Sequence, residues 1–249
     1  MKLYRDLAVY YDEIYDFKNY EKEAGKVKAL IGRYKKSDGR KLLDIACGTG
    51  NHITFLKRKF VVEGMDSSPD MLRIARKKHP DVVFHRGDMS NFKLKSRYDV
   101  ITCLFSAIGH LRTRERMEQA VQNMAVHLRP GGVVIIEPWI TPDNFKRGTV
   151  GAHFVSKPGL KIARINIAKV QGQFSDFEYH YLIGTPDRIR HVIDRESMGL
   201  WTHTEYMNAV RRSGLKAEHD ASGLMGRGLY IGLKPSDNRI VPTISTPDG

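Results

Sequence analysis

Residues 42–51 of the chain are LLDIACGTGN, and this stretch decides the fold. An apolar run that ends in a Gly-x-Gly turn predicts a buried parallel strand followed closely by a helix. Because glycine has no Cβ, Gly48 and Gly50 would let a ligand approach the backbone. The third glycine of the dinucleotide fingerprint is absent, and Ile53 stands in its place. We therefore expect a nucleoside site that does not bind a pyrophosphate at this turn.

A second apolar segment supports this interpretation. Residues 60–65, FVVEGM, form the next predicted strand, and Asp66 follows directly. An acidic residue at the tip of the second strand, about 20 residues after the glycine turn, is placed to accept hydrogen bonds from ribose hydroxyls. Asp66 is therefore the expected ribose-binding residue.

Length and composition predict an α/β domain with an elaboration. The chain has 249 residues, 41% of them hydrophobic, which is enough for a sizeable core. Its sequence contains no apolar run long enough to span a bilayer and no signal-peptide core at the N-terminus. Cys47 and Cys103 are expected to be reduced thiols without metal-ligand spacing, so we expect no metal site. These features together predict a cytoplasmic protein.

The positive charge leaves several partners open. The chain carries 41 Lys and Arg against 28 Asp and Glu, a formal net charge of +13. This balance is compatible with a nucleic-acid partner, an anionic small substrate or only a solvated surface. The basic residues are scattered and lack the interleaved aromatic side chains that stack bases, which disfavours nucleic acid. A phosphorylated small substrate explains the charge equally well.

Strands alternate with helices along most of the chain, which predicts a parallel sheet built from right-handed crossovers. Residues 148–195 differ, because they contain period-two segments without helices. We interpret them as an antiparallel β insertion that serves as a lid or as a dimer surface. The predicted units are an N-terminal helical lid over 1–38, a binding domain over 39–147 and 196–234, the insertion over 148–195, and a disordered tail over 235–249.

The order of motifs resembles the class I S-adenosylmethionine-dependent methyltransferases. The matching segments are LLDIACGTGNH (42–52), VEGMDSSPDMLRIAR (62–76), FHRGDM (84–89) and HLRPGGVVIIEPW (127–139). The resemblance implies a doubly wound, seven-stranded Rossmann-like sheet, with the antiparallel insertion after strand five, and S-adenosyl-L-methionine as cofactor. The cofactor-binding residues that it implies are Tyr11, Tyr20, Asp44, Ala46, Gly48, Gly50, Asp66, Ser67, Met71, Asp88, Met89 and Phe105.

The resemblance also implies individual roles. Asp44 would orient the glycine loop or the ammonium group, and Asp66 would accept both ribose hydroxyls. Met71 would cover one face of the adenine, although packing of its helix is the alternative. Asp88 would accept the exocyclic amine, although a loop cap is the alternative. The Met89 backbone would meet a ring nitrogen.

Three further segments are similar to the nucleotide-sugar N,N-dimethyltransferases: FSAIGHL (105–111), EPWITPDNF (137–145) and GRGLY (226–230). This narrower likeness implies methylation of the amine of a TDP-linked amino deoxyhexose, and a homodimer that uses the insertion. The connector over residues 16–19 looks shorter than in that family, and Ile140-Thr141 replaces an aromatic-rich stretch. Because these segments border the acceptor pocket, the sugar and the amine position stay open.

Candidate catalytic residues follow from the chemistry of amine methylation. An amine attacks only when it is neutral, so a nearby acceptor or a water path must remove its proton. His110 matches a histidine implicated in catalysis in the narrower family. The alternative to a catalytic role is a solvent-facing position at the start of a helix. Tyr4 is a second candidate, unless the N-terminal tyrosines only staple an amphipathic helix.

The acceptor site has three further candidates. Arg227 resembles a phosphate clamp, with a strand-edge position as the alternative. Trp139 and His180 are expected to wall the acceptor site, unless they are core or interface residues. Other functions also stay open: methylation of a different small molecule, of RNA or of protein, and cofactor binding without turnover. The stretch LFSA at 104–107 lacks the Asn/Asp-Pro-Pro-Tyr/Phe motif of nucleobase and protein amide methylation.

Overall fold

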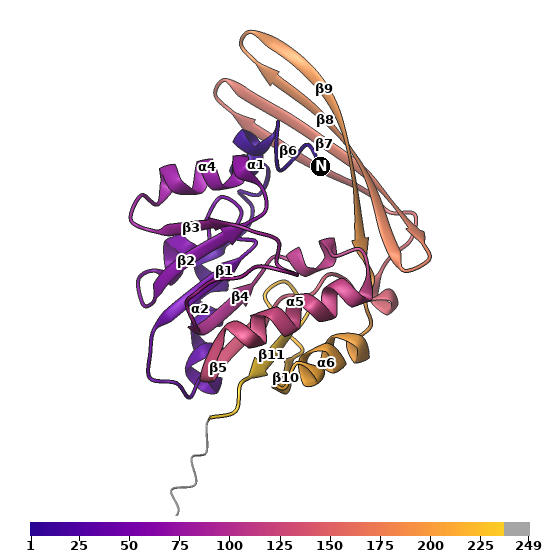
Figure 1. The fold of residues 1–249 in the computed structure, drawn as a ribbon. Coiled ribbons are helices and arrows are strands. Elements are labelled where there is room, and N and C mark those ends of the chain that lie inside the picture. Colours follow the sequence, from indigo (N-terminus) through magenta and orange to yellow (C-terminus); the bar gives the residue numbers. More distant parts are fainter. Residues whose placement is uncertain (237–249) are drawn as a thin grey trace, which may run out of the picture.

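The computed structural model describes residues 1–236 and contains two β-sheets (Figure 1). Sheet A has seven strands in the order β10-β11-β5-β4-β1-β2-β3. These strands are β1 Lys41–Ile45, β2 Val61–Asp66, β3 Val83–Arg86, β4 Tyr98–Cys103, β5 Leu128–Ile136, β10 Lys216–Asp220 and β11 Leu229–Leu233. Strands β1 to β5 pair in parallel, and β11 is antiparallel to both β5 and β10. The predicted doubly wound Rossmann-like sheet is confirmed.

Helices lie on both faces of sheet A because its strands are apolar on both faces. On one face, α5 and α6 pack on alternate residues such as Leu43 and Ile101. On the other face, α2 and α3 pack on the intervening residues, such as Leu42 and Val100. The α-helices are α1 Tyr11–Ile14, α2 Tyr20–Tyr34, α3 Ile53–Leu56, α4 Pro69–Lys78, α5 Arg114–His127 and α6 His203–Arg212; the 3₁₀ helices are η1 Ala8–Tyr10, η2 Ala107–His110 and η3 Pro142–Asn144.

Polar side chains fix where the helices begin. Asn19, Ser68 and Thr113 each accept a hydrogen bond from a backbone N–H in the first turn of the helix that follows. Thr202 and Glu205 form a reciprocal capping box at the start of α6. The cap at Ser68 matters most for the site, because it places the start of α4 directly after Asp66.

Sheet B is the predicted antiparallel insertion. Its strands are β6 Val150–Lys157, β7 Leu160–Gln171, β8 Phe174–Thr185 and β9 Arg188–Gly199, in sequential order. The N-terminal segment lies between α4 and one face of this sheet (Figure 1). That inner face carries Tyr181 and Ile183, which pack on Leu7 and Ile14 of the segment and form a third core with it.

Some boundaries differ from the sequence-based expectations. The helix expected directly after the glycine turn is only one turn long, α3, because residues 48–52 continue the glycine-rich loop. Strand β6 was not predicted, since both of its faces mix apolar residues with small or polar ones. Strand β9 runs to Gly199, beyond the expected end of the insertion. Except for its first two residues, the predicted disordered tail over 235–249 lies outside the described residues.

Two further observations concern the cysteines and the length of the apolar helices. Cys47 and Cys103 are free, on neighbouring strands β1 and β4 or just after them, as expected. Within residues 1–236, no helix is both long and apolar enough to cross a membrane.

Candidate active site

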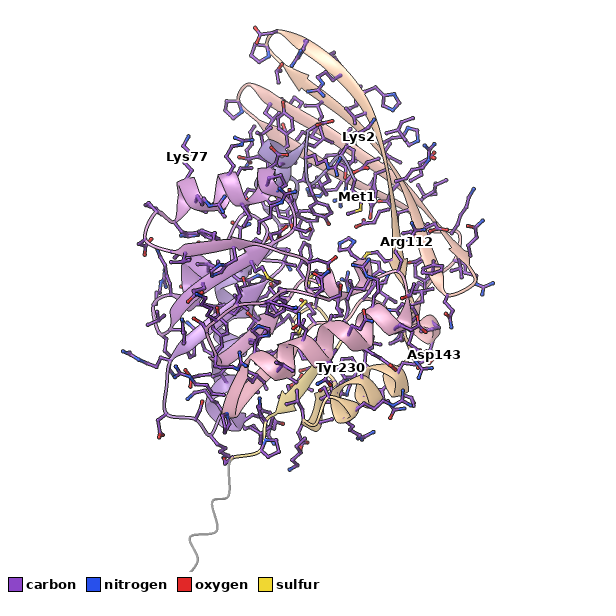
Figure 2. All side chains as sticks on the ribbon, viewed as in Figure 1. Met1, Lys2, Lys77, Arg112, Asp143 and Tyr230 are labelled. Atoms are coloured by element: carbon purple, nitrogen blue, oxygen red, sulfur yellow. The ribbon has the colours of Figure 1, made fainter. Side chains whose placement is uncertain are left out.

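A cavity of about 390 Å³ opens between the ends of β1, β2 and β4, the N-terminal segment and the inner face of sheet B. This volume suits a small-molecule site. Figure 2 shows Met1, which lines the cavity, on the side of sheet B that faces the rest of the molecule. The sequence-predicted residues that the structure brings together here are Tyr4, Tyr11, Tyr20, Asp44, Ala46, Gly48, Asp66, Ser67, Met89, Phe105, His110, Trp139 and Arg227.

Asp66 organises one end of the cavity, which we call the cofactor end. Its two carboxylate oxygens accept hydrogen bonds from the backbone N–H groups of Gly48 and Ser68, each at 2.8 Å. Gly48 has φ of +56° and no atom within 4 Å of the position a Cβ would take, so its backbone faces open space. Each Asp66 oxygen keeps a lone pair for a further donor, which suits two adjacent hydroxyl groups.

Asp44 lies beneath the glycine loop and is 2% exposed. Its carboxylate accepts a hydrogen bond of 2.7 Å from the hydroxyl of Thr102 on the neighbouring strand. Burial raises the pKa of Asp44 to about 6, although the Thr102 hydroxyl opposes this shift. A cationic group placed in this end of the cavity would favour the ionised carboxylate.

The N-terminal segment closes over the cofactor end. Asp12 accepts hydrogen bonds from Thr49 at 2.6 Å and Asn51 at 2.9 Å, both in the glycine loop, and from Lys78 on α4 at 2.7 Å. The three contacts join the segment to the glycine loop and to α4. Tyr11 lies in the same segment, and burial holds the pKa of its phenol well above the usual range.

Backbone strain marks the cavity wall. Ala46, Phe105 and Ser106 have φ of 54°, 51° and 61°, the left-handed region that non-glycine residues rarely adopt. Glu137, on the neighbouring strand end, accepts a hydrogen bond of 2.6 Å from the Phe105 N–H and so holds the turn after β4 in this conformation. Such strain concentrates at functional sites, and all three strained residues line the cavity.

The other end of the cavity, which we call the acceptor end, contains His110 and Tyr4. The Tyr4 hydroxyl lies 3.4 Å from His110 Nε2, and the two rings meet edge to face. Burial lowers the pKa of His110 to about 4, so the imidazole is neutral near pH 7. Burial also keeps the pKa of Tyr4 well above its ordinary value, so its phenol stays protonated. A neutral imidazole can accept a proton.

Two guanidinium groups give the acceptor end its positive charge. Arg227 donates a 2.7 Å hydrogen bond to Ser106 and stacks over Trp139 at 4.5 Å from the ring centroid. Arg164, on β7, lies over the rings of Tyr15 and Tyr179, and its Nε is buried without a hydrogen bond among the described residues. These groups suit an anionic part of a ligand, because a guanidinium matches phosphate oxygens in a bidentate geometry.

Comparisons with known proteins agree with this geometry. A family model described as a methyltransferase domain matches residues 42–132. The chain is 40% identical over 232 residues to dTDP-3-amino-3,6-dideoxy-alpha-D-glucopyranose N,N-dimethyltransferase from Streptomyces fradiae, covering 92% of this chain and 91% of the relative. The chain belongs to the nucleotide-sugar N,N-dimethyltransferase family. It is an S-adenosylmethionine-dependent methyltransferase, as its motifs predicted.

Two other relatives show how widely this family match extends. The dTDP-4-amino-2,3,4,6-tetradeoxy-D-glucose N,N-dimethyltransferase from Saccharopolyspora spinosa is 35% identical, with 92% of this chain and 93% of the relative covered. A SAM-bound structure of an amino pentose methyltransferase from Micromonospora echinaspora is 36% identical, with a TM-score of 0.80 over 87% of this chain and 92% of that one. The two relatives differ in the sugar they are named for.

In this methyltransferase, four sequence-predicted site residues do not line the cavity. Gly50 packs against His79, which a Cβ at Gly50 would approach to 2.8 Å. Met71 is buried in the core formed with the N-terminal segment. This position resembles the packing of its helix that was the alternative for Met71. The Asp88 carboxylate pairs with Arg116 and accepts a hydrogen bond from the Ser90 hydroxyl in its own loop. This arrangement resembles the loop cap that was the alternative for Asp88.

His180 is the fourth of these residues. It lies on the outer face of sheet B, where its ring contacts His191 and Glu178. This face is opposite to that of Tyr179, because successive residues of a strand point to opposite sides. The structure therefore does not bring His180 to the acceptor end.

Sequence reasoning missed several cavity residues, above all those of sheet B. They include Arg164, Asn166, Phe177, Tyr179, Glu196 and Met198. A usable signal existed, because charged residues share the inner face with apolar ones, at Arg164 on β7 and at Asp194 and Glu196 on β9. The described residues hold no group of three or more His, Cys, Asp or Glu side chains arranged for a metal ion.

Proposed function

We propose that this enzyme transfers a methyl group from S-adenosyl-L-methionine to the amine of a nucleotide-linked amino deoxy sugar. The observation that carries this proposal is the composition of the acceptor end. A neutral, partly buried His110 lies beside Tyr4, and the guanidinium groups of Arg164 and Arg227 line the same cavity. This combination provides an acceptor for an amine proton and cations for a diphosphate. The names of the relatives support the same substrate class.

The cofactor end has the donors and acceptors that S-adenosylmethionine requires. Asp66 would hold the ribose hydroxyls, Gly48 would lie beneath the methionyl part, and Asp44 would face the ammonium group. The bound cofactor supplies an electrophilic methyl group on a sulfonium that is already a good leaving group. The protein's own contribution is therefore mainly to place the two reactants and exclude water.

The residues of the acceptor end provide the proton chemistry. A sugar amine is largely protonated near pH 7 and has to lose a proton before its nitrogen can attack. His110 Nε2 is the nearest neutral base to the Tyr4 hydroxyl. Tyr4, whose phenol stays protonated, would hold the amine or relay its proton to His110. Arg227, stacked on Trp139, would bind the diphosphate and so fix the distance between the sugar amine and the cofactor.

We also propose that the enzyme is a cytoplasmic homodimer built on the outer face of sheet B. The face is apolar and open: Phe154 is 66% exposed, Leu182 50% and Ile189 74%. An exposed apolar patch of this kind is typical of a protein interface. Native mass spectrometry tests the assembly, with a dimer expected for the natural sequence and a monomer for Phe154→Asp. A monomeric natural protein would contradict the proposal.

A panel assay tests the substrate class. The purified enzyme is incubated with S-adenosylmethionine and TDP-linked amino sugars that carry the amine at C3 or at C4, because the relatives are named for both positions. We expect a mass gain of one or two methyl groups on at least one of them, and none on the matching sugars without an amine. Turnover on RNA or on a protein, with no gain on any amino sugar, would overturn the proposal.

A further inference from the structure

A buried acid faces His110 from the insertion. Glu196 lies on β9, on the inner face of sheet B, and only 12% of its side chain is exposed. Its Oε1 is 3.4 Å from His110 Nδ1, and the Tyr179 phenol favours the ionised form of the same carboxyl. Glu196 also lines the cavity. An acid this deeply buried needs a reason, because burial disfavours its charged form.

The two nitrogens of the His110 ring face different partners. Nδ1 faces the Glu196 carboxyl, and Nε2 faces the Tyr4 hydroxyl at 3.4 Å. An ionised carboxylate can only accept a hydrogen bond, so its partner Nδ1 carries the hydrogen. Nε2 is then left with a free lone pair directed toward Tyr4. Distances of 3.4 Å are long for hydrogen bonds, as is common at catalytic contacts before substrate binds.

We propose that Glu196 is a positioning residue for His110, holding the ring with its hydrogen on Nδ1 and stabilising the imidazolium that forms when Nε2 accepts a proton. The inference rests on the proposed function, in which the proton comes from the acceptor ammonium. The N–H bond of the ammonium breaks, its electron pair stays on the amine nitrogen, and the proton binds Nε2. The product is a neutral amine beside an imidazolium–carboxylate pair.

The electrostatics explain why His110 needs this partner. Burial lowers the pKa of His110 to about 4, although Asp66 opposes this shift, so the imidazole without a carboxylate partner is a weak base for an ammonium group. Burial raises the pKa of Glu196 to about 7, so its carboxylate forms in the range where the enzyme is expected to work. A carboxylate beside the ring favours the imidazolium.

Other groups tune the same acid. The Tyr179 phenol and the charges of Arg164 on β7 and of the amino group of Met1 favour the carboxylate, whereas Asp194 on β9 opposes it. Asp66 at the cofactor end favours the imidazolium of His110, and the amino group of Met1 opposes it. Ionisation of Glu196 should therefore control the pair near neutral pH.

Kinetics of Glu196→Gln test the inference. Gln keeps a hydrogen-bond acceptor but removes the charge, so we expect kcat on the amino sugar to fall roughly 10- to 100-fold. KM for the sugar and Kd for the cofactor should stay within about twofold, because neither ligand is bound through this charge. In the natural enzyme kcat should rise with pH through about 7, as Glu196 ionises. In Glu196→Gln this rise should be lost or move to higher pH.

A double-mutant cycle separates action through His110 from an independent role. If Glu196 works only through the imidazole, Glu196→Gln combined with His110→Asn should lose no more activity than His110→Asn alone. Multiplied losses would overturn the inference. The matched control is Glu63→Gln, which removes the charge from another half-buried Glu–His pair, with His85 at 2.7 Å, outside the cavity. That variant should keep the natural kcat and pH profile.

Nitrogen NMR of the His110 ring provides a readout that does not depend on turnover. The His110 signals are assigned by their loss in His110→Asn. Near pH 8 we expect the Nδ1–H form in the natural protein and a shift toward the Nε2–H form in Glu196→Gln. An Nε2–H ring in the natural protein would overturn the inference. If no amino sugar is methylated, the proposed function fails. The tautomer of the His110 ring still tests whether Glu196 pairs with His110.

Discussion

The two ends of the cavity are built in different ways. The cofactor end draws most of its residues from a single short region, with Asp44, Gly48, Asp66 and Met89 following one another around consecutive strands of sheet A. The acceptor end draws Tyr4, His110, Trp139, Glu196 and Arg227 from distant parts of the chain. One end is a local motif, whereas the other exists only after sheet B and the N-terminal segment have packed together.

This difference predicts that mutations at the two ends will impair different steps of the reaction. A change at the cofactor end should abolish retention of the cofactor, since a few residues would supply most of its polar contacts. A change at the acceptor end should act on the second substrate or on the chemical step and leave cofactor binding intact. The N-terminal segment connects the two ends, because Asp12 joins it to the glycine loop and to Lys78 on α4.

The largest effect is expected for Asp66→Ala. This carboxylate holds the Gly48 and Ser68 N–H groups and would also accept both ribose hydroxyls. Hydrogen bonds to a charged group contribute about 1.5–3 kcal/mol each, so we expect cofactor affinity to fall roughly 100-fold or more. Isothermal titration calorimetry with S-adenosylmethionine measures the loss. The control is Asp81→Ala, an exposed acid paired with Lys57 that should bind normally. Unchanged affinity in Asp66→Ala would contradict the ribose assignment.

A smaller and more selective effect is expected for Arg227→Gln. The change removes a cation that stacks on Trp139 and donates to Ser106, and with it one charged contact to the proposed diphosphate. KM for the TDP-amino sugar should rise roughly 10- to 100-fold, which corresponds to one charge-assisted hydrogen bond. Cofactor Kd should change little, since the contacts of Arg227 are with Trp139 and Ser106.

The control for this variant is Arg58→Gln. Arg58 is exposed and pairs with Glu21 on the surface, away from the cavity. The Arg58→Gln variant loses the same positive charge as Arg227→Gln, so it reports any general electrostatic attraction of the substrate to the protein. Equal rises in KM for both variants would mean that net charge, and not a clamp at Arg227, attracts the sugar nucleotide.

The sequence predicted which residues meet at the cofactor end, because the signals for this arrangement are local, while the roles of these residues stay predictions. The glycine turn and the acid after the second strand lie within one βαβ unit, and the order of strands places both at one edge of the sheet. Met71 and Asp88 show the limit of that approach. Their side chains have other partners, because Met71 packs with the N-terminal segment and Asp88 pairs with Arg116.

The acceptor end was predictable only in part. His110, Tyr4 and Arg227 were found through similarity to a family, whereas Glu196 and Arg164 were missed because they belong to long, twisted strands of sheet B. Period-two patterning gives the two faces of each strand but does not show which part of a face extends over the cavity. His180 was expected at the acceptor site although its own pattern placed it opposite Tyr179, and the structure has it on the outer face.

The smallest effect expected is a proton released when the cofactor binds. Burial raises the pKa of Asp44 to about 6, so at pH 6 about half of the free enzyme carries a proton on this carboxyl. The ammonium group of the bound cofactor would favour the carboxylate and lower this pKa, so binding at pH 6 should release up to about half a proton per site. At pH 8 Asp44 is already ionised and the release should vanish. Calorimetry in two buffers of different ionisation enthalpy measures the number of protons.

Asp44→Asn keeps an acceptor for the Thr102 hydroxyl but has no proton to lose, so cofactor binding to this variant at pH 6 should release markedly less. Equal release by this variant and the natural enzyme would mean that the proton comes from another group, such as Asp66, whose pKa burial also raises.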